Sequence, residues 1–380
     1  MKRIHIILTI ANSSSVPYFS CFAEKVQKHP EIKLSFICLF DKKPQMLEEM
    51  KEKACDCYWV PFDYKSRKIS MIKAFIDLYI LYKRIKPDIV HSHLFDDSLP
   101  SLMAARLAGI KHRFITKQDT AFHWYYAPKA VKFDKLNNFL ATHIIAVSEE
   151  CKKFILEKEH ADPTKLYLIH HGISLDKLSH STEEYKTELI ARYNLKNKII
   201  IGTVARLIEW KGHRILIDVA EKIIRQNPAI IFLFIGEGEL KPDIIKIIEE
   251  KKLSENILLT GWIEREKIPS LYSIMDIYIH AAKYEPFGFV IAEAMLNGTP
   301  VLSTKTGAAL DAIQNKENGY LVNYNSVDEF VDGINFLLSN DKKSIGEKGK
   351  ITAKTMYNFD KMYESYVALY KKAIIENEKK

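Results

Sequence analysis

The sequence predicts an α/β protein with two doubly wound, Rossmann-like domains. Short apolar runs alternate with helical patterns of about 10 to 18 residues along the whole chain, which is the rhythm of βαβ units. Most of these runs are apolar on both faces, as the strands of a buried parallel sheet must be. The 380 residues are enough for two domains that each bury a core of their own.

The apolar runs fall into two series, which predict seven strands in the first domain and six in the second. The first series comprises residues 4–10, 33–40, 57–62, 88–94, 113–116, 143–148 and 166–170. The second comprises residues 198–204, 230–236, 256–261, 277–282, 300–304 and 319–322. We expect an N-terminal domain of residues 1–175 plus about 359–380 and a C-terminal domain of residues 176–358.

Two segments outside the strands bear on this division. The charged stretch 174–188 lies between the two series and is interpreted as the linker. The helical pattern 359–380 has no strand after it, so we expect this helix to cross back and pack on the first domain.

Composition excludes several classes of protein. A hydrophobic content of 47% and an aromatic content of 11% are typical of a globular chain and exclude a disordered one. No apolar run reaches the ~18 to 20 residues that a membrane helix needs. The apolar start of the chain is better explained by a buried first strand than by a signal peptide, because no small-residue cleavage site follows.

The cysteines point to a cytoplasmic protein. They are odd in number and scattered, and none is spaced from a histidine as zinc ligands are, so free thiols in a reducing compartment are expected. The five positions are Cys21, Cys38, Cys55, Cys57 and Cys151.

The net charge of +8 lies entirely in the first half of the chain. Residues 1–180 hold 28 Lys and Arg against 20 Asp and Glu, whereas residues 181–380 hold 28 of each kind. Part of the excess falls on residues 64–86, a predicted basic helix with an apolar stripe. The stripe predicts either a packed helix with a solvated basic side or a helix that docks on an anionic membrane surface or lipid substrate. The stripe consists of Met71, Phe75, Leu78, Tyr82 and Ile85.

Residues 285–293, EPFGFVIAE, place two carboxylates around the predicted start of a helix. Pro286 breaks any incoming helix, and Gly288 lets the backbone approach a ligand closely. A helix that begins near Phe289 would present unpaired N–H groups, which favour anions. Glu285 would then lie in the loop over this end and Glu293 about one turn inside. The alternative is a surface helix with an acidic residue in its first turn.

Further polar residues follow the predicted strands. Because ligands of open α/β sheets bind beyond the carboxyl ends of the strands, we expect a binding cleft between the two domains. Arg206 follows the strand 198–204, and Lys211 comes five residues later at the start of a helix. Two cations at one sheet edge suit a diphosphate, although both could be ordinary surface bases. Gly236 and Gly238 form a turn that suits a nucleoside better than a phosphate, because Glu237 and Glu239 would repel an anion.

These segments resemble a known family, the retaining glycosyltransferases of the GT-B fold, glycosyltransferase family 4. The match covers nearly all of residues 200–325, in the order and spacing of that family. It is carried by VARLIEWKGH (204–213), FIGEGEL (234–240), LTGWIEREKIPSLYSIMDIYIHAAKYEPFGFVIAEAMLNGTPVLST (259–304) and NGYLV (318–322). The first half matches more loosely, through PDIVHSH (87–93), HIIAVSEE (143–150) and the strand before HHGISLDKL (170–178).

The resemblance implies that the second domain binds a nucleotide-sugar donor. Arg206 and Lys211 would hold the diphosphate, Glu293 the ribose hydroxyls and Glu285 hydroxyls of the donor sugar, with Arg206, Lys211 and Glu285 as the catalytic residues. Other donor contacts would come from backbone N–H groups and from the surroundings of the base. These would be Phe287, Gly288 and Phe289 for the sugar and phosphate, and Trp262, Ile263, Gly236 and Gly238 for the base.

The first domain, by the same resemblance, would bind the acceptor. No metal or other cofactor is expected, because the two cations and the helix end would replace a metal ion. His93 stands where the family has a histidine near the acceptor, although a lone histidine is more often structural. Neither a nucleic-acid partner nor a repeat architecture is expected.

The sequence departs from the family pattern at three places. A Gly-Gly loop after the first strand is replaced by Asn12 and Ser13 with two further serines, which either cap the next helix or contact donor or acceptor. Gln118, followed by Asp119, stands where the family often has a histidine; glutamine can bond a sugar hydroxyl but cannot act as a base. His171 replaces the usual asparagine before Gly172.

The function expected from this pattern is hexosyl transfer with anomeric retention. The acceptor would be lipid-linked or a polysaccharide, such as a lipopolysaccharide or capsule precursor, reached by a cytoplasmic enzyme that contacts the inner face of an anionic membrane. Two alternatives stay open: a sugar-nucleotide epimerase or glycogen-type synthase on the same fold, and a non-catalytic subunit that binds a nucleotide-sugar or serves as a scaffold.

Overall fold

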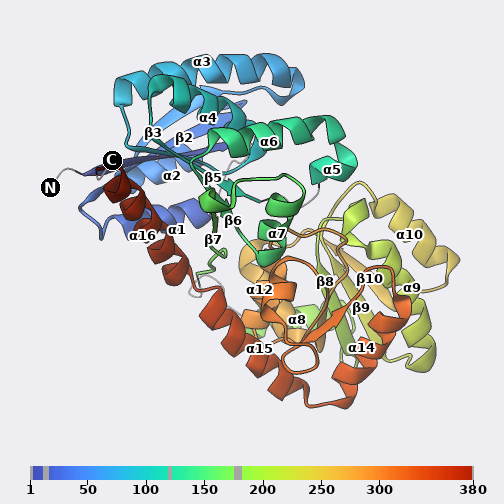
Figure 1. Cartoon of the computed structure of the whole chain (residues 1–380). Coiled ribbons are helices and arrows are strands. Elements are labelled where there is room, and N and C mark those ends of the chain that lie inside the picture. Colours follow the sequence, from blue (N-terminus) through green and yellow to red (C-terminus); the bar gives the residue numbers. More distant parts are fainter. Residues whose placement is uncertain (1–2, 12–16, 119–121, 175–181, 379–380) are drawn as a thin grey trace. The chain divides into compact units, whose positions relative to one another are not determined.

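The computed structural model describes residues 3–11, 17–118, 122–174 and 182–378 (Figure 1). The chain divides into two compact units. Unit 1 comprises residues 1–170 and 360–380, and unit 2 comprises residues 171–359. Each is a parallel α/β sheet with helices, so the predicted fold class is confirmed. Among the described helices, none combines the length and the hydropathy that crossing a bilayer requires.

Unit 1 is built on a seven-stranded parallel sheet with the order β3-β2-β1-β4-β5-β6-β7. β1 lies at its centre, with Ile6 opposite Leu34 of β2 and Ile89 of β4. All seven predicted strands are present. Their bounds are β1 Ile4–Ala11, β2 Ile32–Phe40, β3 Asp56–Pro61, β4 Ile89–Ser92, β5 His112–Lys117, β6 His143–Ala146 and β7 Leu166–Leu168.

Most helices of unit 1 lie in the connections between successive strands. The helices are α1 Pro17–Val26, α2 Met46–Glu52, α3 Arg67–Ile85, α4 Phe95–Ala108, α5 Phe122–Tyr126, α6 Val131–Leu140, α7 Glu149–Glu157 and the last helix of the chain, α16 Phe359–Glu378.

The apolar stripe predicted for residues 64–86 lies on α3 and packs inward. Leu78 and Tyr82 are buried, and Met71, Phe75 and Ile85 pack against the same core cluster as Val90 of β4. The hydroxyl of Tyr82 is satisfied by Ser101 on α4, 2.8 Å away. The interpretation as a packed helix with a solvated basic side is therefore confirmed for this stripe.

The helix α16 packs on unit 1 through three buried tyrosines. The hydroxyl of Tyr370 lies 2.6 Å from Nδ1 of His91 on β4, and the ring of Tyr363 contacts Phe22 of α1 at 4.9 Å. Tyr366 lies 3.2 Å, oxygen to oxygen, from Thr116 of β5. Aromatic rings on one face of this helix thus complete the core over β4 and β5.

Unit 2 is built on a six-stranded parallel sheet with the order β10-β9-β8-β11-β12-β13. All six predicted strands are present: β8 Ile199–Val204, β9 Ile230–Ile235, β10 Ile257–Gly261, β11 Ile277–His280, β12 Val301–Thr304 and β13 Tyr320–Val322. The helices are α8 Glu183–Arg192, α9 His213–Gln226, α10 Lys241–Glu250, α11 Ile268–Ile274, α12 Phe289–Leu296, α13 Gly307–Ala312, α14 Val327–Ser339 and α15 Lys342–Met356.

The interpretation of residues 174–188 as a linker is wrong for their second part. Thr182 caps α8 by accepting a hydrogen bond from the backbone N–H of Tyr185, and Glu183 and Glu184 fill the first turn, where the helix dipole favours acids. Leu189 is buried on the same helix, which contacts α11. Leu189 is the one buried residue of this helix, and half of its ten residues are charged, so the stretch resembled a linker. Residues 175–181 lie outside the described residues.

Candidate nucleotide-sugar site

The order of the strands in unit 2 reverses between β8 and β11. The chain runs from β8 outward through β9 to β10, and then returns to β11 and continues through β12 to β13. At such a switch point the loops after the two central strands diverge and leave room for a ligand. Arg206 follows β8, and the segment 285–289 follows β11. The predicted donor residues therefore lie at the edge of the sheet where a ligand is expected.

Lys211 and Glu285 form an ion pair at this switch point. The ammonium of Lys211 contacts Oε2 of Glu285, and both side chains are largely buried, with 14% and 13% of their surfaces exposed. His280, at the end of β11, places Nε2 3.4 Å from the same oxygen, which is within ion-pair range but outside hydrogen-bond geometry. Its other ring nitrogen lies 3.3 Å from the hydroxyl of Tyr278.

These contacts fix the charge of Glu285. Burial alone would raise the pKa of this carboxyl, but the contact with His280 and the positive charge of Lys211 outweigh burial and hold the pKa at about 2. Burial lowers the pKa of His280, against the attraction of Glu285. At neutral pH the site therefore holds a carboxylate and a neutral imidazole beside Lys211.

Gly212 is the residue that brings Lys211 to the sheet. It has φ +75° at the start of α9, and a Cβ on it would stand 2.0 Å from the carbonyl oxygen of Ala281. The backbone N–H of Lys283 donates to the carbonyl of Trp210 over 2.8 Å. The turn before α9 thus lies directly on the chain that leaves β11, which places Lys211 beside Glu285.

Arg206 lies in the same turn but remains open to solvent. Its carbonyl accepts a hydrogen bond from the N–H of Ile208 over 2.9 Å, and the carbonyl of Ile208 accepts from the N–H of Lys211 over 3.1 Å. The guanidinium is exposed and makes no ion pair or hydrogen bond with any residue in the described part of the chain. An exposed cation in the same turn as Lys211 is suited to an anionic ligand.

The predicted helix start near Phe289 is confirmed, because α12 begins there with Gly288 as its N-cap at φ +86°. The loop before it is held by Gly307, where a Cβ would stand 2.5 Å from the carbonyl oxygen of Glu285. The N–H of Ala308 donates to the carbonyl of Phe287 over 2.6 Å. His171 packs on this loop, with its ring stacked on Phe289 at 4.9 Å.

Glu293 lies one turn inside α12 and is buried. Its carboxylate accepts hydrogen bonds from the guanidinium of Arg265 and from the hydroxyl of Tyr272, each over 3.2 Å. Burial raises its pKa, against the attraction of Arg265 and the bond from Tyr272. A carboxylate can accept about four hydrogen bonds. The two oxygens of Glu293 accept one each from Arg265 and Tyr272, so both can still accept hydrogen bonds from ligand hydroxyls.

The two glycines after β9 lie against the backbone that carries Arg206. A Cβ on Gly236, at φ +140°, would stand 2.1 Å from the carbonyl oxygen of Ala205, and one on Gly238 would stand 2.3 Å from that of Leu207. The N–H of Gly236 donates to the carbonyl of Gly261 over 2.9 Å. The predicted base-binding segments therefore meet at one sheet edge. Beyond it, Trp262 is exposed and Ile263 half-buried.

In unit 1 the predicted acceptor residues are only partly described. His93 is buried after β4, stacks on His91 at 4.2 Å and places Nδ1 3.2 Å from the carbonyl oxygen of Thr9. Burial lowers its pKa to about 4. These contacts favour the structural interpretation of His93. Gln118 is half-buried directly after β5, whereas Asn12, Ser13 and Asp119 lie outside the described residues.

Two family models match the chain and together span most of it. Residues 31–177 match the model Glycosyltransferase Family 4, and residues 186–351 match the model Glycosyl transferases group 1. The chain is a GT-B glycosyltransferase of the family 4 type. The matches fall on unit 1 and unit 2 respectively, so both halves of this glycosyltransferase carry the family pattern.

Known proteins similar to the glycosyltransferase include an Escherichia coli UDP-Gal:alpha-D-GlcNAc-diphosphoundecaprenol alpha-1,3-galactosyltransferase. It is 26% identical over 353 residues, which cover 88% of this chain and 89% of that protein. A glycosyltransferase structure from Rickettsia africae matches with TM-score 0.79 and 22% identity over 98% of this chain and 99% of that one. The Anabaena protein Alr3699/HepE, solved with UDP-glucose, matches with TM-score 0.78 and 16% identity over 97% and 99%.

Sequence reasoning missed three side chains that hold the two acids of the glycosyltransferase. His280 ends an apolar strand five residues before Glu285, and a lone histidine there is ordinarily structural. Arg265 and Tyr272 are 28 and 21 residues from Glu293. No local pattern connects residues so far apart, and only the fold brings them together.

The depressed pKa of Glu285 predicts a distinct pH dependence of stability. The folded-state pKa of about 2 lies below the ordinary 4.5. The ionised carboxylate therefore stabilises the fold above pH 4.5, and this contribution is lost as the pH falls towards 2. Urea unfolding should show that the stability difference between the native protein and Glu285→Gln shrinks between about pH 6 and pH 3.

Glu293→Gln is the matched control for this measurement. The raised pKa of Glu293 means that ionisation of this carboxyl costs stability. The free energy of unfolding of the native protein should therefore rise relative to that of Glu293→Gln as the pH falls. A difference for Glu285→Gln that does not change with pH would contradict the assignment of the ion pair.

Proposed function

We propose that the enzyme transfers a hexosyl group from a nucleoside-diphosphate sugar to a hydroxyl of a lipid-linked or polysaccharide acceptor, with retention of anomeric configuration. The observation that supports it most is the contact between Lys211 and Glu285. Lys211 was predicted to hold the diphosphate, and Glu285 was predicted to hold the donor sugar. These two parts of a nucleotide-sugar are joined by a single oxygen, so their binding groups must lie side by side.

In the proposed step the bond from the anomeric carbon to the diphosphate oxygen breaks while the bond to the acceptor oxygen forms on the same face of the sugar. The acceptor proton passes to an oxygen of the departing diphosphate, so no protein base is needed. Negative charge builds on the diphosphate, and Arg206 and Lys211 stabilise it, which is the larger part of catalysis in such a step.

Glu285 would orient the donor sugar through its hydroxyls and would not act as a proton acceptor, because its pKa of about 2 makes it a poor base. Glu293 would bind the ribose hydroxyls with the oxygens that Arg265 and Tyr272 hold in place. The N-terminus of α12 would face the sugar and phosphate. We further propose that these groups replace a metal ion, so a chelator should leave activity unchanged.

The acceptor class is supported by the similar Escherichia coli enzyme, whose name specifies a diphosphoundecaprenol-linked acceptor. The donor class is supported by the UDP-glucose complex of the Anabaena protein. We propose a role in the biosynthesis of a cell-surface glycan such as a lipopolysaccharide or capsule. The transfer reaction would take place at the inner face of a membrane.

A donor panel tests the proposal. The full chain is incubated with UDP-, GDP- and ADP-linked hexoses and with a polyprenyl-diphosphate monosaccharide in detergent, and the released nucleoside diphosphate is measured. One donor should be consumed with equal formation of an elongated acceptor, whose new linkage is examined by NMR. Binding of a donor without release of the nucleoside diphosphate would indicate a non-catalytic subunit. Formation of an epimerised sugar would indicate an epimerase. A product with inverted anomeric configuration would exclude retention.

A further inference from the structure

The helix α3 has a second apolar stripe, and this one faces solvent. Ile69, Ile72, Ile76 and Ile80 are spaced three, four and four residues apart, which places them on one side of a helix. Between 48% and 64% of each side chain is exposed. They lie opposite the packed stripe that contains Leu78 and Tyr82. Single exposed apolar residues are ordinary, but a continuous row of four is typical of an interaction surface.

The apolar surface continues onto the two neighbouring helices. α3 packs beside α4, and α4 packs beside α6 (Figure 1). The exposed apolar side chains of these two helices are Met103 and Leu107 on α4 and Leu136 and Phe139 on α6. The guanidinium of Arg106 lies over the ring of Phe139, 5.2 Å from the ring centre, which is within cation–π range. We call the outer surface of α3, α4 and α6 the docking face.

The docking face is strongly basic. Its exposed charges include one acid, Asp77, among the described residues of the three helices. The exposed bases are Arg67, which pairs with Asp96 of α4, and Lys68, Lys73, Lys83, Arg84, Arg106, Lys132 and Lys135. Lys73 and Lys83 lie on the same side of α3 as the isoleucines, so cations and apolar side chains alternate there.

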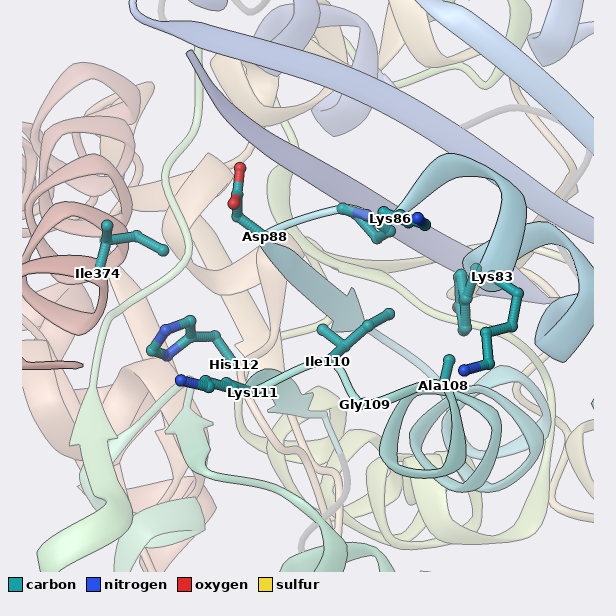
Figure 2. Close-up of a pocket in the computed structure, with 11 residues that line it drawn as sticks. Lys83, Lys86, Asp88, Ala108, Gly109, Ile110, Lys111, His112 and Ile374 are labelled. Carbon is teal, nitrogen blue, oxygen red and sulfur yellow. The ribbon is translucent and has the colours of Figure 1, made fainter. Parts of the chain in front are cut away.

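A basic pocket adjoins the end of α3. Its cavity is about 440 Å³ in volume and opens where β4 and β5 begin, at the opposite edge of the sheet from their carboxyl ends. Figure 2 shows Lys83 and Lys86 from the end of α3 and Lys111 from the residue before β5 around this pocket, with Asp88 as the acid. Three ammonium groups against one carboxylate extend the basic surface beyond the helices.

We propose that the docking face binds an anionic lipid bilayer, with the four isoleucines at the boundary between headgroups and acyl chains. Lysines and arginines beside them would contact lipid phosphates, since long basic side chains keep their charge in the headgroup layer while their stems lie on apolar surface. A second protein is a poorer fit, because lysine is depleted in the cores of protein interfaces. The proposed lipid-linked acceptor gives this face its purpose, but binding to lipid needs no donor.

Co-sedimentation of the full chain with vesicles tests the inference. Vesicles of phosphatidylcholine with phosphatidylglycerol are compared with vesicles of phosphatidylcholine alone, at about 0.1 M and about 1 M salt, where the screening length falls from ~10 Å to ~3 Å. We expect binding to the anionic vesicles that weakens at high salt. Equal binding to both vesicle types, or none to either, would overturn the inference.

Two variants separate the apolar and the charged contributions. Ile72→Gln/Ile76→Gln and Lys73→Gln/Lys83→Gln should each weaken binding by about tenfold or more, because each removes two groups that enter or contact the bilayer. The matched control is Ile351→Gln on α15 of unit 2, whose side chain is 59% exposed and is followed by Lys354 one turn later. It should bind as the native protein does.

Three further readings complete the test. Thermal unfolding of each variant should match the native protein, since the replaced side chains are exposed, and transfer to a detergent-dispersed acceptor should be unchanged. If the native protein binds the anionic vesicles but transfers no sugar, the proposed function is overturned and the inference about lipid binding stands. Sedimentation velocity identifies the rival occupant: a dimer that Ile72→Gln/Ile76→Gln disperses, without vesicle binding, would overturn the inference.

Discussion

Replacing Arg206 with alanine is expected to lower kcat by about 10² to 10³-fold, as the loss of one preorganised stabilising group does in other enzymes. The guanidinium is exposed and makes no ion pair with any described residue, so the fold does not depend on it. The free energy of unfolding should therefore stay within about 0.5 kcal/mol of the native value. Steady-state kinetics and urea unfolding of the same preparation measure both quantities.

Arg214→Ala is the matched control for this variant. Arg214 is an exposed arginine near the start of α9, and its guanidinium is already paired with Asp243 over 3.2 Å. It should retain full activity, because removing one positive charge from this surface does not touch the donor. A kcat for Arg206→Ala within twofold of the native value would remove Arg206 from the catalytic residues.

Replacing Lys211 with alanine is expected to reduce both activity and stability. The loss of activity should again be about 10² to 10³-fold in kcat, because the second cation on the diphosphate is removed. Unlike Arg206, Lys211 is largely buried against Glu285, and its loss leaves a buried carboxylate whose remaining ion-pair-range contact, among the described residues, is His280. Breaking a buried ion pair in this way should cost about 3 kcal/mol of unfolding free energy at neutral pH.

The double variant Lys211→Ala/Glu285→Gln separates the two effects. Without its negative charge, residue 285 no longer needs a cation, so the double variant should recover much of the lost stability. It should not recover activity, because the diphosphate still lacks its second cation. Recovery of activity would mean that Lys211 serves only to neutralise Glu285. A double variant as unstable as Lys211→Ala would contradict the ion-pair account.

The fold could be predicted because its strands are buried on both faces. The strand Ile230–Ile235 is apolar at every position, as a strand of a parallel sheet buried on both faces must be, and this pattern can be seen in the sequence alone. The second part of the predicted linker was harder, because α8 buries only Leu189 and half of its ten residues are charged. A helix with so little apolar surface carries no periodic signal.

The site could be predicted only in part, for a related reason. Glu285, Gly288 and Glu293 stand within one short segment, so their spacing alone indicates a loop over a helix N-terminus. The side chains that set their charge come from other elements, as Arg265 does for Glu293. On α3, periodicity detected the stripe with Leu78 but not the one with Ile76. Both spacings suit a helix, and only tertiary contacts decide which is covered.

The packing of α16 has a consequence for synthesis of the chain. Tyr363, Tyr366 and Tyr370 complete the core of unit 1, and Tyr370 supplies the hydroxyl that bonds to buried His91. These tyrosines leave the ribosome only after the whole of unit 2. Until then the nascent N-terminal sheet carries an uncovered apolar surface, and Nδ1 of His91 lacks the hydroxyl of Tyr370. Unit 1 therefore completes its core only after unit 2 has been translated, and a stop codon before residue 363 would leave that core unfinished.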